Sequence, residues 1–313
     1  MSNANVATMR FKTLLQREWM QHRWGWLAVM ALPLVIALLS MPFGGNWQFG
    51  PDDELKEVGS VLNLALSSKL AAAVWGFSTM AVLSLTLLAM MLQVSGLARR
   101  DAQDRSLEFW TSLPGSHSEH IGATLLAHCL LVPLAAIGVG VASGLVIAAC
   151  AVVKVWGFGA LAQVQWITVA GLLLPGLVRL VVGLSLFMLW LSPLVLLLMA
   201  ASAWLKRLGV PAVVVAGVVL GNLPATRDFV RPWLKAHAEG MSQAFFVSHP
   251  QQWMAAGGDG KGIRGMDLGQ IWQIVGADIG NQLQALASAQ FVSGLLIAGL
   301  CFAALVYKRK HMI

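Results

Sequence analysis

Long apolar runs separated by short polar segments are the main pattern of this chain. A helix that crosses about 30 Å of hydrocarbon needs roughly 20 mostly apolar residues, and several runs approach or exceed this length. In the stretch from residue 121 to residue 205 the only basic residues are Lys154 and Arg179. We therefore predict six membrane-spanning helices, at residues 24–41, 71–97, 121–151, 171–205, 208–226 and 289–307.

The basic residues predict the sidedness of these helices, because Lys and Arg gather in the cytoplasmic loops of membrane proteins. If the N-terminus is cytoplasmic, the inner segments hold Arg10, Lys12, Arg17, Arg23, Arg99, Arg100, Arg105, Lys206, Arg207, Lys308, Arg309 and Lys310. The two short outer loops then hold only Lys56, Lys69 and Lys154. A seventh span in the middle stretch would move the last two inner clusters outside. Six spans with both termini in the cytoplasm therefore fit best.

Three segments outside the spans have patterns of their own. Residues 6–23 are predicted to form an amphipathic helix on the inner membrane surface, with Phe11, Leu14, Leu15 and Trp19 on one face and Arg10, Thr13, Arg17 and Gln21 on another. Residues 98–120 form a charged cytoplasmic loop, and residues 227–288 form a long outer region. Apolar residues recur at helical spacing late in that region, which predicts a helix leading into the last span: Leu268, Ile271, Val275, Ile279 and Leu286.

Composition supports an all-α, polytopic membrane protein with a single transmembrane domain over residues 1–313. Charged residues are 11% of the chain, against roughly 25% in soluble domains, and mean hydropathy is +0.72. These values exclude a soluble enzyme, a nucleic-acid binder and a disordered scaffold. The net charge is +7. The basic residues that produce it flank apolar stretches and do not gather on one face, so no nucleic-acid partner is expected. Because Cys129, Cys150 and Cys301 lie inside apolar runs, we expect no disulfide and no metal site.

Three polar side chains in or beside the spans are candidates for function. An arginine within the membrane costs about 2.5–3.5 kcal/mol on insertion scales, so Arg179 either extends to the outer surface, lines a substrate path or meets an anionic lipid headgroup. His128 either packs as a neutral, hydrogen-bonded side chain or takes part in gating such a path. Glu18 either sits at headgroup level or pairs with a basic residue of the next cytoplasmic segment.

Other classes of membrane protein fit the spans less well. The six predicted spans contain no Asp or Glu, whereas ion-coupled carriers usually place carboxylates at membrane depth. We also find no nucleophile–base pair, no paired carboxylates and no metal-ligand spacing of His and Glu in the predicted helices. Neither a secondary carrier nor a membrane enzyme is therefore favoured.

The cytoplasmic loop carries the strongest functional signal. Pro114 disfavours a helix beyond the residue before it, which predicts a helix from Arg99 to Leu113. Its residues Leu107, Trp110 and Leu113 form an apolar stripe, and Asp101 and Arg105 form an i,i+4 pair. Such a stripe between charges suits a docking surface for a cytoplasmic partner, although it can also lie on lipid headgroups. Ser116 or Ser118 is expected to cap the helix that follows.

This loop resembles the one between the second and third spans of permeases in the type-2 ATP-binding-cassette (ABC) exporter family. The matching positions are Ser106, Leu107, Glu108, Ser112, Leu113, Pro114, Ser116 and Glu119. The sequence departs from the family pattern at Arg105, His117 and Thr124, which usually hold Gly, Arg and Lys. The predicted surface helix, six spans and outer helical segment also agree with the family over essentially the whole chain.

The resemblance implies a role in which this chain binds no cofactor itself. Two such subunits, identical or related, would pair with two separate ATPase subunits, which bind ATP and magnesium. The loop helix would dock on the ATPase and transmit the ATP-driven closure of the ATPase to the membrane spans. The complex would lie in a bacterial cytoplasmic membrane. The residues expected to carry that coupling are Arg99, Asp101, Arg105, Leu107, Glu108, Trp110, Leu113 and Pro114. The alternative is a membrane anchor of the same family that transmits ATP-driven motion to an extracytoplasmic partner and exports nothing.

Overall fold

The computed structural model describes residues 3–42, 64–103, 116–246 and 268–311, and gives no side-chain detail for residues 3–7 and 98–103. Within these ranges the chain is helical and contains no strand. The long helices are α1 (Asn3–Ser40), α3 (Leu66–Gln103), α6 (Val132–Trp156), α7 (Trp166–Leu205) and α12 (Ala289–Lys310). The shorter ones are α5 (His117–Leu125), α8 (Gly209–Asn222), α9 (Arg227–Phe245) and α11 (Leu268–Ala285), together with a π-helical turn at Leu126–Leu131 and 3₁₀ turns at Phe158–Gln163 and Lys206–Leu208.

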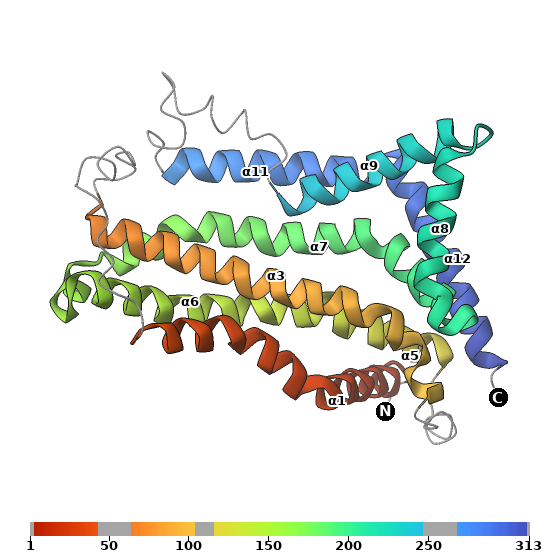
Figure 1. Cartoon of the computed structure of the whole chain (residues 1–313), viewed down its shortest axis with the longest axis horizontal. Helices are drawn as coiled ribbons and strands as arrows, with labels where there is room; N and C mark the ends of the chain where they lie inside the picture. Colours follow the sequence, from red (N-terminus) through yellow and green to blue (C-terminus); the bar gives the residue numbers. More distant parts are fainter. Residues whose placement is uncertain (1–2, 43–63, 104–115, 247–267, 312–313) are drawn as a thin grey trace.

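The helices run in two main directions. Figure 1 shows α3, α6 and α7 side by side across the view, with α1 along α6 and α11 along α7. At the end where the C-terminus lies, α8 and α12 run crosswise to this group and pack on the later part of α7. Pro175 and Pro193 lie inside α7, and prolines inside a helix are a common cause of bending.

Five stretches are long and apolar enough to cross a membrane: Thr8–Ser40, Leu66–Leu97, His117–Trp156, Trp166–Asn222 and Ala289–Lys310. These stretches identify a multi-pass membrane protein. The fifth predicted span, at residues 208–226, corresponds to α8, which lies at the end of the stretch Trp166–Asn222. Helix α8 has 14 residues and a length of about 21 Å. Because the hydrocarbon layer is about 30 Å thick, α8 alone does not meet the length requirement, and the count of six stays a prediction.

A tight reversal joins α7 to α8. Lys206 adopts a φ of 54°, which is uncommon for a residue with a side chain. A Cβ added to Gly209 would lie 2.5 Å from the Cα of Ser202, so only glycine allows the two helices to approach this closely. The basic pair Lys206–Arg207 therefore lies at this turn, which is where the sequence pattern predicts the loop between the fourth and fifth spans.

Helix α1 differs from the predicted arrangement of a surface helix followed by a separate span. It continues without a break through residues 23 and 24. Its exposed and buried faces also differ from the prediction, since Arg17 is buried whereas Trp19 is 39% exposed. The side chains that face the core recur every fourth residue and form a narrow stripe along α1. Leu14, Glu18, Trp26 and Met30 in this stripe are buried, and His22 between them is half-buried.

Among the described helices, the most extensive packing joins α3 and α6. Gly144 faces Trp75, and a Cβ there would lie 2.8 Å from a ring carbon of that tryptophan. Gly140 faces the backbone of Thr79 in the same way, at 3.1 Å. The indole Nε1 of Trp75 donates a 2.8 Å hydrogen bond to the carbonyl oxygen of Val141. Small residues on α6 thus let a large aromatic side chain of α3 approach the α6 backbone.

The predicted helix before the last span is confirmed as α11, which ends four residues before α12 begins. Together with α9 it lies along α7. The buried positions of α11 are Ile271, Val275, Asp278 and Gln282. Ile279, which the apolar pattern placed on this face, is only half-buried, and its neighbour Asp278 takes the buried position.

Candidate functional site

The regular stripe on α1 brings Glu18 and His22 to the same side of the helix, one turn apart. Side chains four residues apart lie on one helix face, and α1 packs on α3, α5, α6 and the turn between α5 and α6. Glu18 is only 4% exposed. A carboxylate and an imidazole are therefore held against the neighbouring helices, close to the boundary predicted between the surface helix and the first span.

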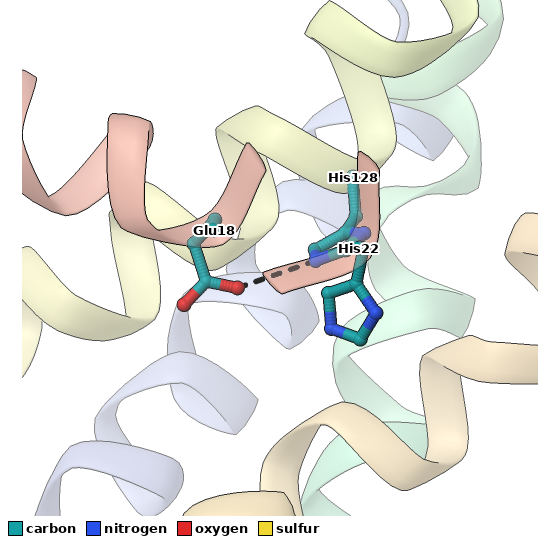
Figure 2. Close-up of side chains that lie close together, drawn as sticks. All are labelled: Glu18, His22 and His128. Carbon is teal, nitrogen blue, oxygen red and sulfur yellow. Dashed lines mark hydrogen bonds and ion pairs between the residues drawn. The ribbon is translucent and has the colours of Figure 1, made fainter. Parts of the chain in front are cut away.

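His128 meets these two residues from the opposite side. It lies in the π-helical turn that links α5 to α6, and it is 1% exposed. One extra residue in such a turn re-aims the side chains around it, and π-helical turns are often found at functional sites. The Nε2 of His128 lies 3.3 Å from Oε2 of Glu18, and the dashed line in Figure 2 marks this contact.

The three side chains form a compact cluster, which we call the Glu18–His22–His128 cluster. One potential ligand atom from each residue lies within 4.8 Å of the other two. The imidazole rings of His22 and His128 meet edge to face with centroids 5.0 Å apart, and Trp26 covers His128 at a centroid distance of 5.8 Å. A cavity of about 300 Å³ adjoins the cluster and is lined by Glu18, Trp19, Trp26, His128 and apolar residues of α6 and its preceding turn.

One carboxylate and two imidazoles at this spacing allow two kinds of chemistry. The pair Glu18–His128 can share a proton through its hydrogen bond. All three groups can also bind a metal ion, since imidazole nitrogens and a carboxylate form a common donor set for Zn²⁺. Sequence reasoning found no such spacing because the third donor lies 110 positions beyond Glu18.

Arg179 occupies a second buried polar site, on α7. Its Nε–H donates to the carboxylate of Asp278 on α11. Its two terminal nitrogens donate to the carbonyl oxygens of Gln243, Ala244 and Phe246, at 2.8 to 2.9 Å. These carbonyls belong to the C-terminal end of α9, where the last turn of a helix leaves its carbonyls without helical partners. Arg179 therefore caps α9 and joins three helices.

An apolar cavity of about 520 Å³ lies beside Arg179. Its walls come from α3, α6, α7, α11 and the end of α9, and they include Trp75, Met80, Leu177, Phe245 and Val275. Among the described residues that line this cavity, Arg179 is the one with a charge. The cavity volume falls in the range of roughly 300–1,000 Å³ that is typical of sites for small molecules.

The structure brings together two of the three buried polar residues named from sequence. Glu18 pairs with His128, and Arg179 lies elsewhere, against Asp278. The side chains of Arg99, Arg100 and Arg105 are not among those that the structure describes, so the pairing of Glu18 with a basic residue of this segment stays a prediction. Sequence reasoning missed His22 and Asp278. The spacing of Glu18 and His22 by four residues was the available signal for the first, and no local pattern marks the second.

The coupling residues predicted from the loop lie largely outside the described part of the chain. Arg99 and Asp101 belong to the last turn of α3, without side-chain detail, and Arg105, Leu107, Glu108, Trp110, Leu113 and Pro114 are outside the described residues. The described part resumes at Ser116. Its hydroxyl accepts from the backbone N–H of Glu119, whose carboxylate accepts from the backbone N–H of Ser116. This capping box confirms the expected helix start.

Comparisons of the chain with protein-family models, with curated proteins and with solved structures found no match. Its function is therefore inferred from its residues and their geometry.

Proposed function

We propose that this chain is the membrane-spanning subunit of an ATP-driven exporter of the type-2 ABC family. The observation that carries the proposal is the segment from Arg99 to Ala127, in which a charged run, an apolar stripe, Pro114 and a helix start follow in the order seen in that family. The capping box formed by Ser116 and Glu119 supports this comparison, because both residues belong to the matching pattern.

The fold is consistent with such a subunit. Five stretches suited to crossing a membrane, an all-helical described chain and a helix directly before the last span are features that the family shares. The proposal adds a sixth span at α8, cytoplasmic termini and a bacterial inner membrane. It also adds a second permease subunit and a separate ATPase that binds ATP and magnesium, while this chain binds no nucleotide.

The apolar cavity beside Arg179 favours export over a purely mechanical anchor. An anchor needs no hollow between its helices, whereas an exporter must accept a substrate between them. The lining is apolar except for a few groups, and the guanidinium of Arg179 already donates to four acceptors. We therefore expect a substrate with a substantial apolar part, bound mainly by the loss of its contact with water.

Co-purification tests the proposal. The chain, carrying a tag without histidines, is purified from native membranes in mild detergent, and the proteins that accompany it are identified and quantified. We expect an ABC ATPase in equal amount. In the double variant W110D and L113D the ATPase is expected to be lost, because two charges replace apolar contacts of the docking stripe.

A control separates docking from general damage. Phe229 is an exposed aromatic residue of α9, 75% exposed, on the side that the proposed topology places outside. Phe229→Asp should leave the ATPase bound and the amount of protein in the membrane unchanged. A folded wild-type chain that brings no ATPase, or a double variant that keeps it, would contradict the proposal.

A further inference from the structure

We propose that the Glu18–His22–His128 cluster binds one divalent first-row transition-metal ion, with Zn²⁺ as the best-suited ion, and that the ion joins α1 to the turn between α5 and α6. This proposal does not depend on the assignment as an exporter. It follows from the geometry of three side chains and from the cavity beside them.

The donor atoms have the spacing that a small ion requires. Zinc binds imidazole nitrogen and carboxylate oxygen at about 2.0–2.2 Å, so two ligands of a tetrahedral ion lie about 3.4 Å apart. The Nε2 of His128 and Oε2 of Glu18 are 3.3 Å apart. The ligand atom of His22 lies within 4.8 Å of both. Closing the separation from 4.8 Å to about 3.4 Å needs a movement of at most about 1.4 Å, which a rotation of the half-buried His22 ring can supply.

The burial of the donors strengthens their attraction for a cation. Glu18 and His128 are 4% and 1% exposed, and Trp26 packs on the ring of His128. Charges interact more strongly where water is largely excluded. A Glu18 carboxylate with two neutral imidazoles carries one negative charge, which a divalent ion more than balances.

The cavity provides a free coordination position. Zinc sites with three protein ligands keep a fourth position for water or another small ligand. The cavity of about 300 Å³ is lined by both Glu18 and His128, so a water molecule on the ion has room on that side. The site is therefore of the open kind, in contrast to closed sites with four protein ligands.

His22 distinguishes metal binding from a simple hydrogen bond. The pair formed by Glu18 and His128 satisfies its hydrogen bond without His22. If the cluster forms only that hydrogen bond, His22→Ala leaves the bond between Glu18 and His128 in place. If the cluster holds an ion, His22→Ala removes one of three protein ligands. Since loss of a group that merely orients a ligand already weakens metal binding 10–100-fold, loss of a ligand should weaken it by more than about 100-fold.

The test uses the full chain, purified in detergent with a tag that contains no histidine and treated with a chelator. After equilibration with Zn²⁺, bound metal is measured by mass spectrometry, and Co²⁺ is used in parallel because its visible absorption reports coordination geometry. We expect one Zn²⁺ per chain, a tetrahedral Co²⁺ spectrum, and loss of both in His22→Ala and His128→Ala. The control His117→Ala changes a histidine of α5 outside the cluster and should keep both signals.

If His128→Ala fails to fold, His22→Ala alone tests the metal site. His22 is only half-buried, so its replacement should disturb the fold less. Folding of each variant is confirmed by thermal unfolding without metal. A folded wild-type chain that binds no Zn²⁺ at equal stoichiometry would overturn the proposal. Binding of equal strength in wild type and His22→Ala would also overturn it, since the ion would then be held by other surface groups.

Discussion

The two buried polar sites of this protein hold their charges in different ways. Arg179 donates to one carboxylate and three backbone carbonyls, so four of the five donors of its guanidinium have partners. Each site borders a cavity, but Glu18, by contrast, faces two imidazoles across a few ångströms. An arginine with nearly all its donors used serves to fix helices in place. A carboxylate among titratable groups beside open space can bind a ligand.

Their positions explain this difference. Arg179 meets the C-terminal end of α9, where unpaired carbonyls and the helix dipole favour a cation. The partners of Arg179 come from two helices, α11 and the end of α9, and Arg179 itself lies on a third helix, α7. The Glu18–His22–His128 cluster lies at the π-helical turn that links α5 to α6, where His128 meets two side chains of α1. Arg179 therefore joins helices through fixed hydrogen bonds, whereas the cluster gathers groups that can bind a ligand.

The largest effect is expected from Arg179→Met. It leaves Asp278 buried without its cation and three carbonyls without a donor. Breaking a buried ion pair from one side costs about 3–5 kcal/mol, which we expect to see as a large fall in the thermal unfolding temperature in detergent. The double variant Arg179→Met and Asp278→Leu should recover part of the loss. A single variant as stable as the wild type would show that the ion pair does not hold these helices together.

A glycine pair tests how tightly each region is packed. A Cβ at Gly183 would lie 2.5 Å from the carbonyl oxygen of Ala244, and it would also press on the Arg179 side chain. Gly183→Ala should cost about 1–3 kcal/mol of stability, which is typical of overpacking. Gly122 on α5 has no atom within 4 Å of such a Cβ, so Gly122→Ala should be neutral or stabilise the helix by about 0.5–1 kcal/mol. Thermal unfolding of both variants checks the prediction, and equal losses would contradict it.

A smaller effect is expected from Glu18→Gln. The amide keeps an oxygen that can accept a hydrogen bond but loses the negative charge. Without metal we expect a loss of about 0.5–1.5 kcal/mol, the usual value for one hydrogen bond. Zinc should raise the unfolding temperature of the wild type, because a ligand that binds the folded state stabilises it, and this rise should be absent in the variant. Equal stabilisation of both proteins by zinc would exclude Glu18 as a ligand.

The smallest effect concerns His237 on α9, which is not among the helices suited to crossing the membrane. Burial lowers its pKa, against a smaller opposing effect of its hydrogen bond to the carbonyl oxygen of Trp233. The Nδ1–H makes that bond, and Nε2 is buried without a partner among the described residues, facing Gly294. Protonation at Nε2 would place a charge in an apolar contact.

The pH dependence follows from this lowered pKa. In the unfolded chain His237 binds a proton below about pH 6.5, whereas in the folded chain it resists doing so. Its contribution to stability is therefore fully present above pH 6.5 and is lost as the pH falls toward the lowered pKa. His237→Gln should reduce the fall in unfolding temperature between pH 7 and pH 5. An unchanged pH profile in the variant would assign the effect to other groups.

Features that depend on neighbouring residues were predictable from sequence. The apolar runs predicted a multi-pass membrane protein, the pattern from Leu268 to Leu286 predicted α11, and a cap at Ser116 or Ser118 predicted the start of α5. Each of these signals lies within one continuous segment of the sequence, where hydrophobic periodicity and capping act.

Contacts between distant segments were not predictable in this way. Arg179 and Asp278 are 99 positions apart, and Glu18 and His128 are 110 apart. The pattern of α1 also suggested that Arg17 faces away from the protein, because a charged side chain on a surface helix usually does. Its burial shows that the direction of an amphipathic face depends on which helices pack on it.

The measurement that most directly tests the proposed role uses a photo-reactive residue at position 110 in native membranes. The crosslinker replaces Trp110 in the predicted docking stripe and, as a control, Phe77 on α3, whose side chain is 77% exposed on a predicted membrane helix. We predict that position 110 captures an ATPase of the ABC class on illumination, whereas position 77 captures lipid. Capture of lipid alone at position 110, in a chain that is folded and present at normal amounts, would contradict the assignment as an exporter subunit.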